Sequence, residues 1–365
     1  EVSGEGVHHA QYAKVYHRRI PAKGLALLRI PSPLAGLFSK DFLCYMRLPQ
    51  HLLDSPFFVF DSSQGFLSAI RGEVSSDDFQ ELNRLIEKGL PPVASVSSLA
   101  VLFGLNPGII QSIIRRPNKH YRQFSIPKGN GTRVIHAPRI ALKLIQKWLS
   151  IWLQKKYIPP NHVYGFIPGR SHVLAATKHT NAKWVFSVDI RNFFPSTPDR
   201  MVLDFMTRLG YRQDGAEIIK RICCLNGGLA QGSPASPVLS NIVFSDLDHR
   251  LEEIAIKHNT RLTRYADDIT FSGIGPYPDG LKEEVISTFA TTPWDIASDK
   301  MELSELPNRL KVHGLLVHGE KVRLTKGYRN KLRAYRHLFN NDKIRGADIN
   351  RIVGHLKYED HIQNT

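Results

Sequence analysis

The sequence RLTRYADDITFS at residues 261–272 decides the fold of this chain. Apolar and β-branched residues lie on both sides of Asp267 and Asp268, which is typical of two short strands joined by a tight turn. Neighbouring side chains on a regular strand point to opposite faces, so only a turn lets both carboxylates approach one cation. Mg²⁺ prefers oxygen ligands, and one or two carboxylates are enough to hold it when phosphates complete the site. An isolated pair would fit a solvated turn better, because Asp is a common turn residue.

Two upstream segments show that the pair is not isolated. The sequence WVFSVD at residues 184–189 is an apolar run ending in one carboxylate, which indicates a buried strand with Asp189 at its exit. The sequence GGLAQGSPASP at residues 227–237 predicts a loop of small residues that opens a helix. Such a loop allows a flat base and sugar to pack closely against backbone.

The order of these segments resembles the palm of reverse transcriptases: a strand ending in Asp, a Gln-Gly-Ser-Pro loop and a Tyr-Ala-Asp-Asp hairpin. The sequence FSIPKGNGTRVIHAP at residues 124–138 looks like the fingers hairpin of that family, and YGFIPGRS at residues 164–171 matches its next fingers block. Residues 303–317 resemble the end of the palm and the primer grip. The resemblance therefore covers about residues 96–345.

Within this family, the chain most resembles the bacterial retron enzymes. These carry an Asn-Ala-x-x-His block, and residues 175–179 read AATKH, which matches Ala and His but not Asn. They also carry Val-Thr-Gly near the end of the palm, where this chain has Val-His-Gly at residues 312–314. A retron-type RNA-directed DNA polymerase is the first interpretation. Another bacterial reverse transcriptase, defence-associated or similar to those of group II introns, is the alternative.

The resemblance implies an α+β fold shaped as a right-hand polymerase. It would have fingers, a palm of antiparallel sheet plus helices, and a helical thumb, preceded by an N-terminal extension. The expected divisions are an extension of unknown role at 1–74, N-terminal helices and fingers at 75–183, the palm with the catalytic motifs and some finger insertions at 184–317, and the thumb at 318–365.

The resemblance also implies the catalytic chemistry, which is two-metal nucleotidyl transfer. Asp189 and Asp267 are expected to bridge two Mg²⁺ ions, with Mn²⁺ as an alternative, and Asp268 is a secondary ligand. The backbone carbonyl of Ile190 is expected to contribute as well. Two such ions, ~4 Å apart, neutralise charge on the attacking and leaving oxygens of an in-line displacement.

Further residues are expected to bind the deoxynucleoside triphosphate. Lys128 and Arg133 would face the triphosphate, one as a point charge and the other as a fork, although both would also fit exposed hairpin positions. Phe194 occupies the position of the family's aromatic steric gate, which selects against a 2′-hydroxyl, whereas Phe193 is expected in the core. The remaining expected contacts are Gln231 and Gly232 around base and sugar, and Lys300 as a proton donor to the leaving pyrophosphate.

A basic amphipathic helix is predicted at residues 324–339, where a polymerase thumb should follow the palm. Its cations are expected to contact the backbone of the duplex product, and they are Lys326, Arg329, Lys331, Arg333 and Arg336. The implied partners are a structured noncoding RNA that serves as template and primer, its cDNA product, and a separate effector protein in anti-phage defence.

Composition agrees with a polyanionic partner. Lys and Arg number 49 against 33 Asp and Glu, which gives a net charge of +16. No apolar run approaches the ~20 residues that span a bilayer, so no membrane association is expected. Three cysteines, Cys44, Cys223 and Cys224, are too few for a disulfide framework or zinc site, and the last two are expected in the core. We therefore expect a reduced, cytoplasmic protein.

Residues 97–114 have the pattern of a helix-turn-helix, which indicates a different class of function. Gly104 would separate two short helices, with Asn106 as the N-cap and Pro107 at the first position of the second helix. This pattern would fit a DNA-binding regulator. A non-catalytic nucleic-acid-binding module is the remaining alternative, against which the intact set of three aspartates argues.

Overall fold

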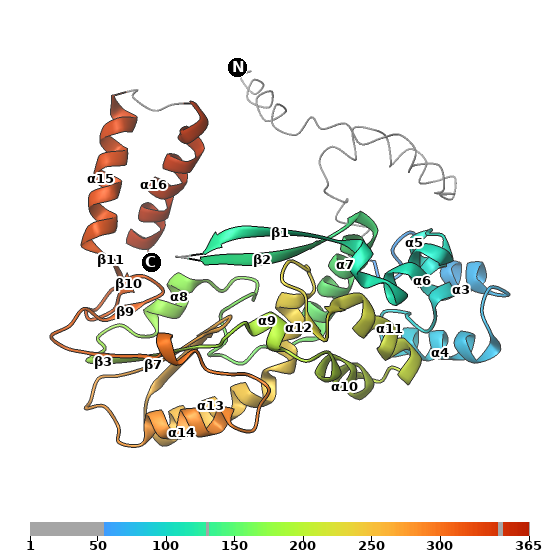
Figure 1. Ribbon diagram of the computed structural model, residues 1–365, viewed down its shortest axis with the longest axis horizontal. Coiled ribbons are helices and arrows are strands. Elements are labelled where there is room, and N and C mark those ends of the chain that lie inside the picture. The colour runs from blue at the N-terminus through green and yellow to red at the C-terminus, as the bar shows by residue number, and fades with distance from the viewer. Residues whose placement is uncertain (1–54, 129–130, 342–345, 365) are drawn as a thin grey trace, which may run out of the picture.

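The computed structural model describes residues 55–128, 131–341 and 346–364 of the chain (Figure 1). Helices combine with antiparallel sheets, which confirms the expected α+β class. Residues 1–54, most of the expected N-terminal extension, lie outside the described residues, as does Cys44. The last part of that extension is described, and Phe58, Phe66 and Ile70 lie in the main hydrophobic core.

Four short helices form one end of the molecule (Figure 1). They are α3 (Ser63–Ile70), α4 (Ser76–Glu87), α5 (Val96–Phe103) and α6 (Pro107–Arg115). The helix-turn-helix pattern is confirmed as local structure, since Gly104 is left-handed at φ 59° and the Asn106 side chain caps Gly108 N at 2.8 Å. Helix α6 packs against α11 (Gln213–Cys223), with Ile110 and Ile113 buried. The helix-turn-helix pair α5 and α6 therefore packs against the hydrophobic core.

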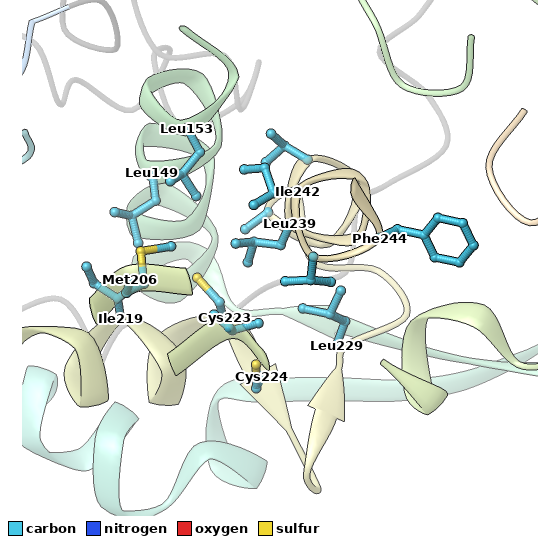
Figure 2. Close-up of a cluster of buried hydrophobic side chains, with 14 of the residues drawn as sticks. Leu149, Leu153, Met206, Ile219, Cys223, Cys224, Leu229, Leu239, Ile242 and Phe244 are labelled. Carbon is cyan, nitrogen blue, oxygen red and sulfur yellow. The ribbon is translucent and has the colours of Figure 1, made fainter. Parts of the chain in front are cut away.

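A long two-stranded hairpin and a helical core follow these helices. The hairpin consists of β1 (Tyr121–Lys128) and β2 (Gly131–Pro138), and the short 3₁₀ helix η3 (Pro117–His120) precedes it. Behind it, α7 (Ile140–Lys156), α10 (Asp199–Leu209), α11 and α12 (Ser236–Val243) enclose apolar side chains (Figure 2). Cys223 and Cys224 belong to this cluster and are buried, which confirms their expected place in the core.

The central sheet carries the motifs that suggested the fold. It is a four-stranded antiparallel sheet in the order β6-β7-β3-β8. The strands are β3 (Trp184–Asp189), β6 (Arg261–Tyr265), β7 (Asp268–Gly273) and β8 (Glu302–Glu305). Phe186 and Phe271 join the main core on one face, while Val185 on the other face packs with Val173 and Ala176. The predicted buried strand and hairpin are thus present.

Shorter elements surround the sheet. Between β3 and β6 lie α9 (Phe193–Ser196), the small hairpin β4 (Cys224–Leu225) with β5 (Gly228–Leu229), and α13 (Ser245–Lys257). Helix α8 (His172–Thr177) precedes β3, whereas α14 (Leu281–Phe289) and η4 (Ser298–Lys300) separate β7 from β8. Helices α13 and α14 pack together (Figure 1).

The C-terminal part is a second, smaller packing unit. Strands β9 (Lys311–Val312), β10 (Leu315–Leu316) and β11 (Arg323–Leu324) form one sheet, and α15 (Lys326–Asn340), η5 (Gly346–Asp348) and α16 (Ile349–Gln363) follow. The expected palm–thumb boundary after residue 317 divides this sheet, because β11 pairs with β10. The first helix of the expected thumb, α15, begins at Lys326, so the small sheet connects the expected palm to the expected thumb. Among the described helices, none is long and apolar enough to span a membrane.

Candidate active site

Three aspartates gather at one end of the central sheet, as expected. Asp189 is the last residue of β3 and lies opposite Asp268, the first residue of β7. Asp267 and Ala266 form the two-residue turn between β6 and β7, and Ala266 is left-handed at φ 60°. The amide of Ile190 donates to the Asp267 carbonyl at 3.1 Å, which ties the turn to the end of β3.

The carboxylates repel each other. Burial and the neighbouring charges of Asp267 and Asp189 raise the pKa of Asp268 to about 6. Burial, followed by the charge of Asp189, also raises the pKa of Asp267. Such accumulated negative charge makes the site a good place for a cation.

In the structure a lysine supplies positive charge. Lys300, on η4, places its Nζ 2.5 Å from Oδ1 of Asp189, and this hydrogen bond raises the pKa of Lys300. Nowhere in residues 55–128, 131–341 and 346–364 do three acidic, His or Cys side chains converge closely enough to hold a metal ion. The aspartate donor set suits a hard divalent cation, and such an ion would compete with Lys300 for Asp189.

A cavity of about 840 Å³ opens beside the aspartates. Seven of the predicted site residues line it, and they are Lys128, Arg133, Ile190, Phe194, Gln231, Asp267 and Lys300. Asp189, Asp268 and Gly232 are not among the lining residues. The structure therefore brings the expected phosphate-binding cations and the steric-gate candidate to the same space as the Asp267 turn.

Gly232 packs closely against the β1–β2 hairpin. It has φ 129°, and a Cβ on it would lie 2.6 Å from the carbonyl oxygen of His136 in β2. The neighbouring carbonyl of Gln231 accepts a hydrogen bond from His136 N at 2.8 Å. The loop thus joins the base of the β1–β2 hairpin, and the glycine permits that close contact.

Two adjacent phenylalanines both line the cavity but differ in burial. Phe193 is 5% exposed and belongs to the main core. Phe194 is half-buried and lines the cavity. Its ring lies 5.8 Å from that of Phe166, which also lines the cavity, and 5.7 Å from that of Phe193. Phe194 is therefore held between two aromatic rings.

The predicted cations of α15 lie apart from the cavity, on an exposed helix surface. Lys326, Arg329, Lys331, Arg333 and Arg336 are all exposed. Three of them have partners. Arg336 lies 2.5 Å from Glu359 of α16, and Arg333 Nη1 donates to Oδ1 of Asn330 at 3.4 Å. Lys331 lies over the rings of Tyr328 and Tyr335. This surface could contact a nucleic acid backbone, but it takes no part in the aspartate site.

Sequence reasoning missed the residues that support the hairpin from behind. His179 is fully buried, and its ring nitrogens lie 2.7 Å from the hydroxyls of Ser272 and Thr263. Burial lowers the pKa of His179 to about 3, so it is neutral at physiological pH. The Ala-x-x-His block was a signal for this position, but the partners on β6 and β7 are distant in sequence.

His313 was another missed contact. It occupies the left-handed first position of the β9–β10 turn, and its ring lies 5.2 Å from that of Tyr265. Its Nδ1 is 3.8 Å from Asp268. The departure from Val-Thr-Gly therefore falls directly beside the aspartate site.

Comparisons with known proteins agree with these features. A family model described as reverse transcriptase (RNA-dependent DNA polymerase) matches residues 126–330. The retron Mx65 reverse transcriptase of Myxococcus xanthus is 33% identical over an alignment of 213 residues that covers 52% of this chain and 50% of that protein. The retron Ec86 reverse transcriptase of Escherichia coli is 27% identical over an alignment of 295 residues that covers 78% of this chain and 90% of that protein.

The match thus spans about half the length of the Myxococcus relative and most of the Escherichia one. Among solved structures, a telomerase from Candida albicans aligns with a TM-score of 0.41 and 10% identity, over 61% of this chain and 50% of that chain.

Proposed function

This chain belongs to the reverse transcriptase (RNA-dependent DNA polymerase) family, and we propose that it is a retron-type enzyme that copies a structured noncoding RNA into single-stranded DNA. One observation carries the catalytic part of this proposal. The Asp267 turn adjoins Asp189 and Asp268 at the edge of a cavity that Lys128 and Arg133 also line. Carboxylates beside phosphate-binding cations suit nucleotidyl transfer.

Asp189 and Asp267 would hold divalent cations, with Asp268 and the Ile190 carbonyl as further oxygen ligands. Two Mg²⁺ ions, or Mn²⁺ in their place, would activate the 3′-hydroxyl and neutralise the leaving pyrophosphate. Burial, followed by the charges of the neighbouring aspartates, raises the pKa of Asp267 and of Asp268, and this supports the assignment. Lys300 would move from Asp189 to the leaving group. There its ammonium group would donate a proton to the pyrophosphate oxygen.

The remaining cavity residues would bind and select the nucleotide. Lys128 and Arg133 would hold the triphosphate from the fingers hairpin. Phe194, fixed between Phe166 and Phe193, would exclude a ribose 2′-hydroxyl. Gln231 would contact the base or sugar, while Gly232 would act indirectly by anchoring its loop to β2.

The parts of the chain correspond to a right-hand polymerase in this proposal. The β1–β2 hairpin and its neighbouring helices are the fingers, the β6-β7-β3-β8 sheet with α13 and α14 is the palm, and α15–α16 is the thumb (Figure 1). Recognition of a structured RNA would depend on shape, phosphates and single-stranded segments. The exposed cations of α15 are suited to the phosphate contacts. A cytoplasmic enzyme that acts with a separate effector in anti-phage defence completes the proposal.

A second candidate has a specific observation in its favour. Two retron signature blocks are altered, with Ala175 in place of Asn and His313 in place of Thr. His313 lies beside Tyr265 and Asp268, where a primer terminus would approach the catalytic turn. Another bacterial reverse transcriptase, with a different way of starting synthesis, would fit these changes.

The test is to isolate the protein from its native host and analyse the nucleic acid bound to it. An Asp267→Ala/Asp268→Ala variant is the test variant, and Asp246→Ala is the matched control. Asp246 is an exposed aspartate of α13 whose nearest cation, Arg208, is 3.9 Å away. We expect a discrete single-stranded DNA whose mobility shifts after RNase treatment, present with the control and absent with the double variant.

Each outcome distinguishes the candidates. DNA that depends on the aspartates but carries no RNA would favour the second candidate. Nucleic acid that is the same in wild type and in the Asp267→Ala/Asp268→Ala variant would contradict the catalytic assignment and indicate a binding protein.

A further inference from the structure

A buried arginine lies directly behind the β6–β7 turn. Arg264 and Asp248 are both 0% exposed, and they form two hydrogen bonds of 2.6 Å, from Nε to Oδ1 and from Nη2 to Oδ2. Removing two charges from water is unfavourable, and apolar residues of similar size often stabilise a fold equally well. Stability alone therefore does not explain this pair, and the further contacts of Arg264 indicate what it does.

The third nitrogen of the guanidinium reaches the turn. Arg264 Nη1 lies 3.1 Å from the carbonyl oxygen of Ala266 and 3.1 Å from Oδ1 of Asn241. Ala266 is left-handed, a conformation that a residue with a Cβ adopts rarely. Because the guanidinium is planar and rigid, the fork on Asp248 also fixes the direction of Nη1. Helix α13, which carries Asp248, thus sets the position of the donor that holds the turn.

Gly165 supports the same turn from another side. A Cβ at Gly165 would lie 2.2 Å from the amide nitrogen of Ala266. Asn241 Nδ2 donates to the Gly165 carbonyl at 2.9 Å, and Tyr164 N donates to the Arg264 carbonyl at 2.8 Å. One asparagine therefore binds both Arg264 and Gly165, so the turn is enclosed by parts of the chain that are distant in sequence.

We propose that Arg264 is a positioning residue, which holds the Ala266–Asp267 turn in the conformation that presents the Asp267 carboxylate beside Asp189. The inference rests on the proposed function, in which these carboxylates bind divalent cations. Arg264 Nη1 binds the Ala266 carbonyl and Ile190 N binds the Asp267 carbonyl, so two successive carbonyls of the turn are held. Arg264 acts through the backbone and contacts no reacting atom.

The test compares variants that remove the hydrogen bond from Arg264 to the Ala266 carbonyl while preserving the buried interior. Arg264→Met/Asp248→Leu removes both charges together, which avoids an unpaired buried ion. Arg264→Lys keeps a charge opposite Asp248 but loses the fork, and Gly165→Ala disturbs the turn from its other side. Arg261→Met is the matched control, because Arg261 lies on the same strand and donates to the carbonyl of Thr180 instead.

The measurements are Mn²⁺ binding by electron paramagnetic resonance, primer extension on an RNA template, and circular dichroism with thermal unfolding, all on the full chain. In the double variant we expect a native spectrum, with Mn²⁺ affinity and kcat each lower by about 10- to 100-fold, as for outer residues that orient metal ligands. The KM for the nucleotide should change little. Arg264→Lys and Gly165→Ala should change in the same direction, and Arg261→Met should match wild type.

A folded double variant with wild-type Mn²⁺ affinity and kcat would overturn the proposal. Should that variant not fold, wild-type values in both Arg264→Lys and Gly165→Ala would overturn it. A different result separates this inference from the proposed function. If Asp267→Asn leaves Mn²⁺ binding and extension unchanged, the catalytic assignment itself fails, and the role of Arg264 fails with it.

Discussion

The turn at Ala266–Asp267 and the helical pair α15–α16 are held by contacts of different kinds. The turn contacts Arg264 and Gly165, and the backbone of Ile190 binds it from β3. Within α15, by contrast, Leu332 is the one buried residue, and polar pairs such as Arg336–Glu359 link it to α16. Metal-assisted chemistry requires ligands fixed within a fraction of an ångström. Contacts with the phosphates of a nucleic acid do not depend on its sequence, and they tolerate movement of the protein side chains. Changes in the two regions should therefore have different consequences.

The largest expected effect is at the turn, where one substitution should lower activity and raise stability. Asp267→Asn should lower the extension rate by ~10³-fold or more, because it removes a ligand of the proposed cation site. The metal-free variant should nevertheless unfold at a higher temperature than wild type at neutral pH, because the charge that repels Asp189 is lost. Extension assays and thermal unfolding in EDTA check both. A variant less stable than wild type would contradict the repulsion at this site.

His179 tests whether the support behind the hairpin is structural. His179→Ala should lower the free energy of unfolding by about 3 kcal/mol, because it leaves a cavity and two unpaired hydroxyls, those of Thr263 and Ser272. Urea denaturation measures this effect. A comparable loss should not follow from His337→Ala, since His337 is exposed on α15.

We expect acid to destabilise the folded protein through His179. Its pKa is about 3 in the folded protein and about 6.5 when unfolded. The unfolded state therefore binds the proton first as pH falls below 6.5, and this contribution to stability is lost progressively toward pH 3. An equal dependence on pH in His179→Ala, measured by urea denaturation, would contradict this assignment.

The raised pKa of Asp268 predicts that the stability of the metal-free protein depends on pH with the opposite sign. In the metal-free protein its pKa is about 6, against 3.8 for an ordinary aspartate. Between these values the folded state binds more protons than the unfolded state, so its stabilising contribution decreases as pH rises through about 6. Asp268→Asn should remove this part of the pH dependence of the melting temperature in EDTA. Retention of the full dependence in the variant would assign it to another group.

The smallest effects are expected on α15. Arg329→Ala should weaken binding of an RNA–DNA duplex a few-fold, independently of sequence, and reduce the slope of log affinity against log salt by about 1. The kcat at saturating duplex should remain unchanged, which is the contrast with Asp267→Asn. Fluorescence anisotropy across a salt series, together with extension assays, would show whether the two regions are separable in this way.

Local sequence patterns predicted the strands and the turn, but not the side-chain contacts between elements that are distant in sequence. The Asp189 strand and the hairpin around Asp267 were predicted correctly, because alternation and turn residues are local signals. Arg264, Asp248 and Asn241 escaped notice because their relationship exists only after β6, α13 and α12 pack together. An arginine in an apolar strand was the available signal.

Two further features also depend on contacts between distant segments. Gly232 remains a predicted nucleotide contact, and the structure adds that its lack of a side chain permits a close approach to His136. The predicted palm–thumb boundary after residue 317 falls within a small sheet, because β11 pairs with β10. A strand of two residues carries too little periodicity to be distinguished from a loop.

The strand order β6-β7-β3-β8 has a consequence for how the molecule opens. The aspartates belong to β3, β7 and the turn that enters β7, and β3 and β7 are the two inner strands. Sheets fray from their edges, and the inner ladder is flanked by β6 along β7 and by β8 along β3 as far as Ser187. Amide protons of Val188 and Ile269 should therefore exchange with deuterium more slowly than those of β8. The segment that carries the chemistry is in this respect also the part of the sheet that opens last.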